Sequence, residues 1–127
     1  MGKGNILVVE DEGVNAAYLE IVLGHHGYSV AGIVRTGEEA LELAMRNHVD
    51  LLLMDIRLAG EVNGITAAER IIRTSGIPVI FVSAYATAEM IAQAMATGAH
   101  DFVVKPYKMN RILHAIAKAL KKGTEPG

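Results

Sequence analysis

Polar side chains follow directly on four short apolar runs of this 127-residue chain. Glu10 and Asp11 follow "ILVV", Asp55 follows "LLLM", Ser83 follows "VIFV" and Lys105 follows "FVV". Carboxylates that gather in one place repel one another, which raises a pKa or requires a nearby cation. Oxygen ligands without His or Cys suit Mg²⁺, and a lysine can pair with a carboxylate or with an incoming phosphoryl group. These residue types indicate Mg²⁺-dependent phosphate chemistry, provided that the fold brings them together.

Five short runs rich in Val, Ile and Leu predict the strands that would position these side chains. Each run is continuously apolar, which is typical of strands covered on both faces in a parallel sheet. The carboxyl ends of parallel strands share one edge, where ligands bind in α/β folds. Four runs would therefore deliver polar groups to one edge, whereas the second run, which ends in Val34 and Arg35, brings no acid. The predicted strands are residues 6–9, 29–34, 51–54, 79–82 and 102–104.

Helical spacing between these runs predicts a repeated β-α order. Thr36 and Glu39 form the Thr-x-x-Glu pattern of a capping box, and Asn63 and Gly64 form a turn into the next helix. Strict alternation of this kind predicts an α/β domain with right-handed crossovers. The predicted helices are residues 15–26, 36–44, 65–73, 86–98 and 109–122.

The composition predicts one globular domain. Hydrophobic residues make up 51% and charged residues 20% of the chain, unlike disordered proteins. The net charge of -2 gives no basic field for nucleic acid or an anionic membrane, and no apolar stretch reaches the roughly 18 residues of a membrane-spanning helix. The lack of cysteine excludes disulfides and thiolate chemistry. We expect a cytoplasmic domain of residues 1–122, followed by a tail or linker of residues 123–127.

Four motifs in order make the sequence resemble the receiver domain of response regulators in two-component signalling. They are "ILVVEDE", "LLLMDIRLAGEVNGI", "IPVIFVSAYA" and "GAHDFVVKPY", and the resemblance extends from Asn5 to Lys122. It implies a flavodoxin-like, doubly wound (βα)5 fold with a five-stranded parallel sheet of order 2-1-3-4-5. It also implies a cis Lys105-Pro106 peptide bond.

The resemblance implies a phosphorylation site at the strand ends. Asp55 is expected to be the phosphoacceptor, with its carboxylate as the nucleophile. Lys105 and the Ser83 hydroxyl are expected to bind the phosphoryl oxygens. Positioning and charge neutralisation do most of the work in phosphoryl transfer, which agrees with these residue types.

The resemblance also implies a metal site. Asp11, Asp55 and the main-chain carbonyl of Arg57 are expected to hold Mg²⁺, for which Mn²⁺ or Ca²⁺ can substitute, and Glu10 is expected to assist directly or through water. The loop "IRLAGEVN" is one residue longer than the commonest receiver form, and Ala59 stands where proline is frequent. The Arg57 carbonyl therefore depends on a loop that departs from the family pattern.

Two further expectations concern the response to phosphorylation. Ser83 is expected to shift toward the new oxygens, which lets Phe102 turn inward and changes the face formed by the fourth helix, fifth strand and fifth helix. Arg57 and Tyr85 stand two residues after Asp55 and Ser83, at positions that modulate loss of the phosphoryl group in this family. Large side chains there are expected to shield the acyl phosphate from water.

The implied partners are a sensor histidine kinase or phosphotransfer protein, a downstream effector domain or protein, and a second copy through the fourth helix, fifth strand and fifth helix. Nucleic acid and membrane are not expected as partners. The chain would be no enzyme beyond assisting its own phosphorylation and dephosphorylation, and would be a stand-alone regulator or one receiver of a larger protein. The main alternative is a pseudo-receiver that only docks or dimerises. Two other functions are disfavoured. A phospho-aspartyl phosphatase usually has a second Asp where this chain has Arg57, and the G-x-G-x-x-G motif of dinucleotide-binding proteins does not follow the first predicted strand.

Overall fold

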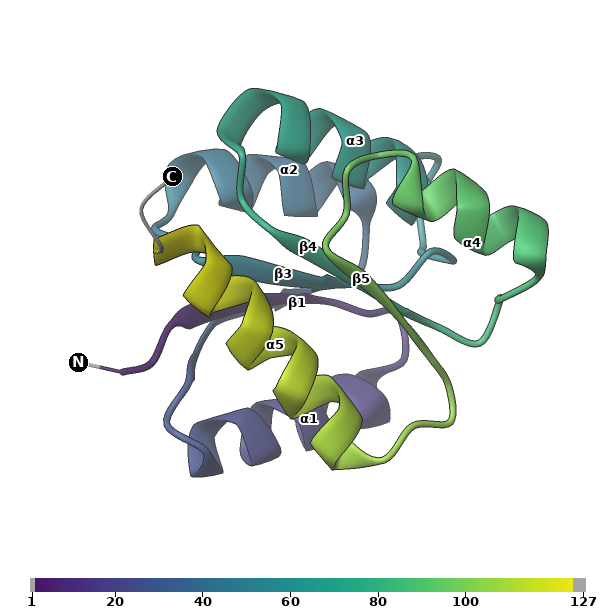
Figure 1. The fold of residues 1–127 in the computed structure, drawn as a ribbon. Helices are drawn as coiled ribbons and strands as arrows, with labels where there is room; N and C mark the ends of the chain where they lie inside the picture. Colours follow the sequence, from purple (N-terminus) through teal and green to yellow (C-terminus); the bar gives the residue numbers. More distant parts are fainter. Residues whose placement is uncertain (1, 125–127) are drawn as a thin grey trace.

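The protein is described by a computed structural model that covers residues 2–124, with side chains described for residues 2–121. Five parallel strands form one sheet of order β2-β1-β3-β4-β5, and a helix follows each strand (Figure 1). This arrangement confirms the predicted fold class and strand order. The elements are β1 (Asn5–Val9), α1 (Gly13–His25), β2 (Ser29–Val34), α2 (Gly37–Arg46), β3 (Leu51–Met54), α3 (Gly64–Ser75), β4 (Val79–Ser83), α4 (Ala88–Met95), β5 (Asp101–Val104) and α5 (Met109–Thr124).

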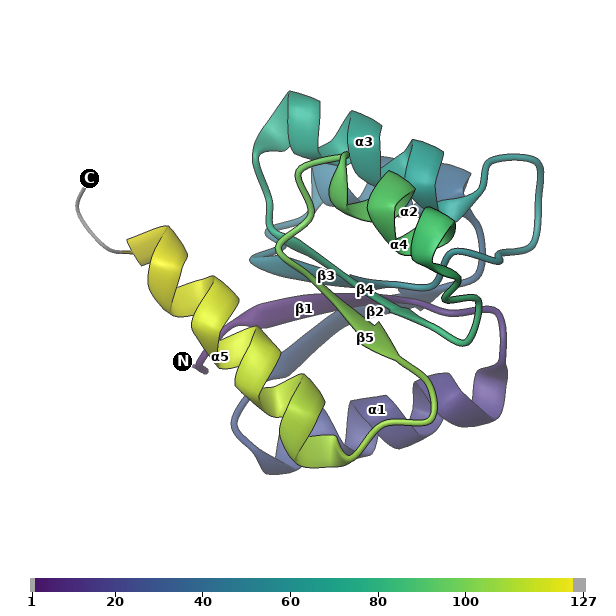
Figure 2. The same ribbon diagram turned by 45° about the vertical axis from the view of Figure 1, so that its right-hand side comes forward.

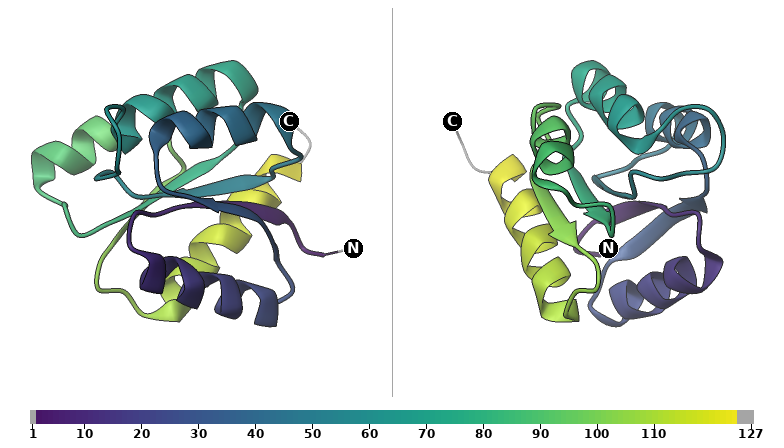
Figure 3. Two further views of the ribbon diagram at one scale, coloured as in Figure 1. Left: turned by 180° about the vertical axis from the view of Figure 1, so that it is seen from behind. Right: turned by 90° about the vertical axis from the view of Figure 1, so that its right-hand side faces the viewer.

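The helices cover both faces of the sheet, which explains why the central strands are apolar throughout. Helices α2, α3 and α4 lie on one face, and α1 and α5 lie on the other (Figures 2 and 3). Leu7 and Val9 of β1 face the first layer, while Ile6 and Val8 face the second. All four side chains are at most 1% exposed, because alternate residues of a strand point to opposite faces.

Local signals account for most of the helix boundaries. The side chains of Thr36, Asn63 and Thr87 each accept a hydrogen bond from the backbone N–H three residues later and cap α2, α3 and α4. The cap at Thr36 was predicted, whereas Asn63 was predicted only as a turn residue and Thr87 was not assigned as a cap. The start of α1 was predicted two residues too late, because Glu12 occupies its N-cap position without a side-chain cap bond. Helix α4 ends at Met95, earlier than predicted.

The carboxyl-terminal helix extends further than predicted. It ends at Thr124, so the first two residues of the predicted tail are helical, whereas residues 125–127 lie outside the described part of the chain. The peptide bond between Lys105 and Pro106 is cis, as predicted. No helix within residues 2–124 has the length and apolar character needed to cross a membrane.

Candidate functional site

The sheet's hydrogen-bond ladder continues past the ends of three strands and fixes the polar residues that follow them. The N–H of Glu10 donates to the Val34 carbonyl at 2.9 Å, and the N–H of Asp55 donates to the Val9 carbonyl at 2.9 Å. The N–H of Lys105 donates to the Ser83 carbonyl at 3.0 Å. The backbone at each of these positions therefore has little freedom, and the side chains leave the sheet from defined points along one edge.

A buried ion-pair cluster stands at this edge, with Lys105 at its centre. The Lys105 ammonium lies 2.6 Å from Glu10 Oε1 and 3.0 Å from Asp55 Oδ2. The side chains of Lys105, Glu10 and Asp55 are 17%, 4% and 11% exposed. One cation thus bridges two carboxylates that are separated by 45 residues in the sequence, from β1 and β3, in a place that water hardly reaches.

Burial and charge act in opposite directions on the groups of this cluster. Burial raises the pKa of Glu10 above its usual range, even though the hydrogen bonds from Lys105 and from the Glu12 N–H favour its charged form. Burial alone would lower the pKa of Lys105, but the hydrogen bonds to Glu10 and Asp55 outweigh it, and the pKa is raised. Lys105 is therefore a firmly charged ammonium, whereas Glu10 carries its charge against the effect of its surroundings.

The loop after Asp55 is held by backbone contacts on both sides. Asp55 Oδ1 accepts a hydrogen bond from the Arg57 N–H at 3.3 Å. The Ala59 N–H donates to the Arg35 carbonyl at 3.1 Å, a bond that a proline at this position could not make. A Cβ atom on Gly64 would lie 2.1 Å from the Asp55 carbonyl oxygen, so only glycine fits where α3 begins against the end of β3.

Asp11 pairs with a cation that the sequence did not assign to the site. Its Oδ1 accepts hydrogen bonds from Nε and Nη2 of Arg35 at 3.3 and 3.2 Å. Arg35 directly follows β2, the strand that brings no acid. The signal available in the sequence was the position itself, because in the observed strand order β2 is the neighbour of β1 and delivers its next residue beside Asp11.

Arg57 and Tyr85 contact each other at the rim of the site. The Arg57 guanidinium lies over the Tyr85 ring, 4.1 Å from its centre, which is the geometry of a cation–π contact. Tyr85 is also tied to the site through its backbone, because its N–H donates to Ser83 Oγ at 3.0 Å. Sequence reasoning placed both residues near Asp55, but it gave no indication that the two side chains stack.

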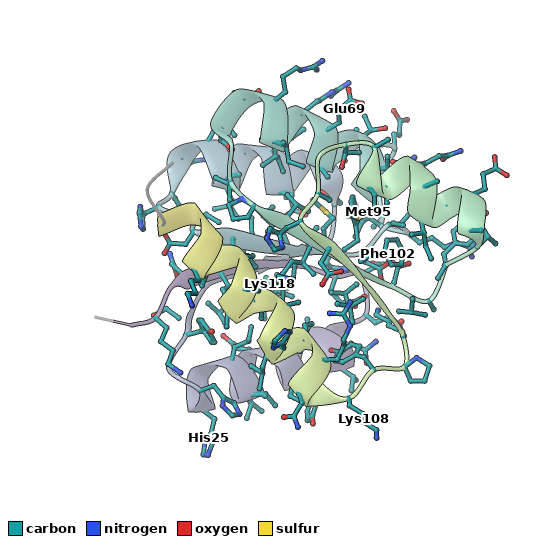
Figure 4. All side chains as sticks on the ribbon, viewed as in Figure 1. His25, Glu69, Met95, Phe102, Lys108 and Lys118 are labelled. Atoms are coloured by element: carbon teal, nitrogen blue, oxygen red, sulfur yellow. The ribbon has the colours of Figure 1, made fainter. Side chains whose placement is uncertain are left out.

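One cavity of about 370 Å³ collects all but one of the predicted site residues. Phe102 is the exception: it is 8% exposed, and its ring lies 6.1 Å from that of Phe81 in the core on the α4 side of β5 (Figure 4). The Phe102 ring, which we expected to turn inward upon phosphorylation, is therefore already buried in this structure. The cavity is lined by Glu10, Asp11, Glu12, Asp55, Arg57, Ser83, Ala84, Tyr85 and Lys105.

The donor set suits a hard cation that needs few protein ligands. Asp11 and Asp55 line the cavity together with Arg57, whose main-chain carbonyl oxygen is the third expected metal ligand. Within the described residues no group of three or more His, Cys, Asp or Glu side chains is arranged to hold a metal ion. Mg²⁺ fits this donor set, because it usually takes only one or two carboxylates and keeps several waters.

Comparisons with known proteins agree with this fold. Residues 6–117 match the response regulator receiver domain family. The chemotaxis protein CheY of Thermotoga maritima is 34% identical over 122 residues, which cover 95% of this chain and 100% of that protein. The transcriptional regulatory protein ZraR of Salmonella typhimurium is 33% identical over 127 residues, which cover 99% of this chain and 28% of ZraR.

A solved structure extends the similarity to three dimensions. The signal receiver domain of a modulated diguanylate cyclase from Desulfovibrio desulfuricans G20 matches with a TM-score of 0.87 and 31% identity, covering 94% of each chain. The chain spans only 28% of the length of ZraR. This chain belongs to the response regulator receiver domain family of two-component systems.

Proposed function

We propose that this receiver domain takes a phosphoryl group from a phosphohistidine onto the carboxylate of Asp55. An Asp55 oxygen forms the new bond to phosphorus while the bond from phosphorus to the imidazole nitrogen breaks, and that nitrogen keeps the electron pair and takes up a proton. One observation carries the proposal: the Lys105 ammonium lies 3.0 Å from Asp55 Oδ2 at a cavity that Asp55 itself lines. A fixed positive charge beside the nucleophile is what a transferring phosphoryl group requires.

Asp11, Asp55 and the Arg57 carbonyl would hold Mg²⁺, with Mn²⁺ or Ca²⁺ as substitutes. When bound, the ion supplies charge neutralisation for the phosphoryl oxygens. Glu10 assists directly or through water, while its Oε1 accepts a hydrogen bond from Lys105 and its Oε2 accepts one from the Glu12 N–H. The chemistry of the protein's own residues is therefore to place the nucleophile and to balance its charge.

Ser83 and Lys105 bind the phosphoryl oxygens in this proposal. Ser83 Oγ accepts a hydrogen bond from the Tyr85 N–H, so its own O–H remains available as a donor to a phosphoryl oxygen. Ser83 is 1% exposed and Phe102 is 8% exposed, so the switch begins with a movement of the buried hydroxyl. Phe102 follows with a small adjustment, and the face formed by α4, β5 and α5 changes shape.

The donor is a sensor histidine kinase or a phosphotransfer protein in the cytoplasm, and the output is an effector domain or a second protein. ZraR, of which this chain matches 28%, is a transcriptional regulator, so an effector domain on the same polypeptide is one form of output. A second copy of the chain, docked through α4, β5 and α5, is another. The domain itself acts as a regulator whose only chemistry is its own phosphorylation and dephosphorylation.

Mass spectrometry of the intact protein tests the proposal. The protein is incubated with Mg²⁺ and a small phosphodonor, and in parallel with Mg²⁺ and beryllofluoride. We expect a covalent phosphoryl adduct in the wild type that is absent without Mg²⁺ and absent in Asp55→Asn. A wild-type protein that is folded, as judged by circular dichroism, yet forms no adduct and does not respond to beryllofluoride would instead be a docking module without phosphorylation.

We further propose that the stacked Arg57 and Tyr85 side chains slow the loss of the phosphoryl group. Both residues line the cavity beside Asp55, and their contact would shield the acyl phosphate from water on that side. Opening a partly exposed cation–π contact costs about 1 kcal/mol, which corresponds to a lifetime of phospho-Asp55 that is about fivefold longer than without it. We expect Arg57→Ala, Tyr85→Ala and the double variant to shorten this lifetime equally, because each one breaks the same contact. An unchanged lifetime in the double variant would refute the shield.

A further inference from the structure

A second cation of the site has no role in the chemistry described so far. Arg35 donates two hydrogen bonds to Oδ1 of Asp11, at 3.3 and 3.2 Å. Among the described residues, the Arg35 side chain forms hydrogen bonds and ion pairs with Asp11 alone. Asp11 is also one of the two carboxylates proposed to hold Mg²⁺. Arg35 and the proposed Mg²⁺ ion therefore bind the same carboxylate, that of Asp11.

We infer that Arg35 is a built-in competitor of the metal ion, which weakens Mg²⁺ binding at Asp11 and leaves this carboxylate when Mg²⁺ binds. The inference rests on the Mg²⁺ site of the proposed function. Both Arg35 bonds end on Oδ1, so the ion can approach through Oδ2 before the Arg35 bonds are lost. A positive charge in contact with the carboxylate still lowers its attraction for a divalent cation.

The backbone holds Arg35 in place, so its side chain can move without disturbing the site. The Arg35 carbonyl accepts the Ala59 N–H at 3.1 Å, and the preceding Val34 carbonyl accepts the Glu10 N–H at 2.9 Å. Both contacts come from the main chain and remain when the side chain is changed. The Arg35 side chain, by contrast, is 69% exposed, and its guanidinium can turn into solvent at little cost.

Lys105 and Arg35 therefore hold the acids of the site in different ways. Lys105 is 17% exposed and bonds to two buried carboxylates at 2.6 and 3.0 Å, so an incoming ion does not displace it easily. Arg35 bonds to one carboxylate that is itself 40% exposed, at 3.2 Å. Of the two cations, Arg35 is the one that gives way, and its charge balances Asp11 only while the metal is absent.

Isothermal titration of the full chain with MgCl₂ tests the inference. We expect Arg35→Gln to bind Mg²⁺ about three- to tenfold more tightly than the wild type, because an exposed pair is worth up to about 1 kcal/mol and the ion carries two charges. Arg46→Gln is the matched control. Arg46 is also 69% exposed and pairs with Glu42, but it stands in the last turn of α2, and we expect no change in Mg²⁺ affinity.

Two further readouts separate competition from a purely structural role. The Arg35 Nε–H resonance in the wild-type NMR spectrum is expected to shift on addition of Mg²⁺, as its bond to Asp11 is lost. Arg35→Lys, which keeps the charge, is expected to bind Mg²⁺ within about twofold of the wild type. If Arg35 had only a structural role, Arg35→Gln would bind Mg²⁺ as tightly as the wild type does. The Arg35 Nε–H resonance of the wild type would also not shift on addition of Mg²⁺.

The outcomes distinguish this inference from the proposed function. If the wild type binds Mg²⁺ and Asp11→Asn does not, the metal site stands; an Arg35→Gln affinity equal to that of the wild type then overturns the inference alone. If neither the wild type nor Arg35→Gln binds Mg²⁺, the metal site and the inference both fall. Tighter binding in Arg35→Gln and unchanged binding in Arg46→Gln supports both.

Discussion

The two ends of strand β5 carry ion pairs of opposite character. At its start, Asp101 accepts two hydrogen bonds from the Arg111 guanidinium of α5 at 2.9 and 3.1 Å, and the two side chains are 32% and 44% exposed. Just past its end, Lys105 bonds to Glu10 and Asp55, which are 4% and 11% exposed. The first pair joins a helix to its strand at the surface, whereas the second gathers charge from three strands in the interior.

The pKa values of the acids at the two ends are shifted in opposite directions. Partial burial acts to raise the pKa of Asp101, but the hydrogen bonds from Arg111 and the Phe102 N–H outweigh it, so the pKa is lowered. For Glu10 burial is the larger effect, and the pKa is raised despite the bond to Lys105. The charged form of Asp101 thus favours the fold, while the charged form of Glu10 is maintained at a cost. The electrostatic environment of β5 therefore differs between its two ends.

Removing the cation at each end should give the largest difference between them. Lys105→Met leaves two buried carboxylates without their partner, and we expect it to lower the free energy of unfolding by about 3 kcal/mol, the low end for a broken buried pair. Arg111→Met exposes Asp101 to water, and we expect a loss of about 1 kcal/mol or less. Urea denaturation at neutral pH, with both variants measured beside the wild type, provides the comparison.

A double variant checks the cause of the larger loss. If unpaired carboxylates account for it, adding Glu10→Gln to Lys105→Met recovers part of the lost stability, because one buried charge is gone. Further destabilisation in the double variant would show that lost packing of the lysine stem, rather than charge, accounts for the effect.

Neutralising the acid at each end should produce effects of opposite sign. We expect Asp101→Asn to lower the free energy of unfolding by about 0.5–1 kcal/mol, because it removes a charge that the fold favours. We expect Glu10→Gln to leave stability unchanged or to raise it by up to about 1 kcal/mol, since the buried site disfavours the charged form. Thermal and urea denaturation at pH 7 measure both. A loss in Glu10→Gln as large as that in Asp101→Asn would remove the contrast between the two ends.

The positions of these charges along the chain were predictable, but most of their pairings were not. Continuous apolar runs located the strands, and the parallel arrangement placed Asp55 and Lys105 at one edge. Lys105 was expected to pair with a carboxylate or a phosphoryl group. The contact of Arg35 with Asp11 and that of Asp101 with Arg111 were not foreseen. Such contacts depend on strand register and on the rotamers of long side chains, which sequence spacing does not determine.

Close backbone approaches were equally hidden. Gly64 was interpreted as a turn residue, yet its role is to let α3 begin against the Asp55 carbonyl, where a Cβ would lie at 2.1 Å. Ala59 was seen as a departure from a proline pattern, and the structure shows the hydrogen bond that its N–H makes to the Arg35 carbonyl. The start of α2 was predicted because the Thr36–Glu39 capping box is a local pattern, whereas α1 lacks a side-chain cap and its start was misplaced.

The smallest expected effect is the pH dependence of the two acids. Because the folded-state pKa of Asp101 lies below its ordinary value of 3.8, its contribution to stability is present above pH 3.8 and is lost as the pH falls through the folded-state value. The folded-state pKa of Glu10 lies above 4.5, so the folded protein binds the extra proton, and stability falls as the pH rises from 4.5 through that value.

Urea denaturation from pH 3 to pH 7 makes both effects visible as differences from the wild type. The stability deficit of Asp101→Asn should shrink as the pH falls below 3.8, because the unfolded wild-type chain then takes up the proton more readily than the folded protein. The relative gain of Glu10→Gln should grow as the pH rises above 4.5, because the wild-type carboxyl then loses its proton in a site that favours the protonated form. If both differences changed with pH in parallel, the two ends of β5 would have the same electrostatic character. Burial would then not be what distinguishes the charged cluster at Asp55 from the surface pair at Asp101.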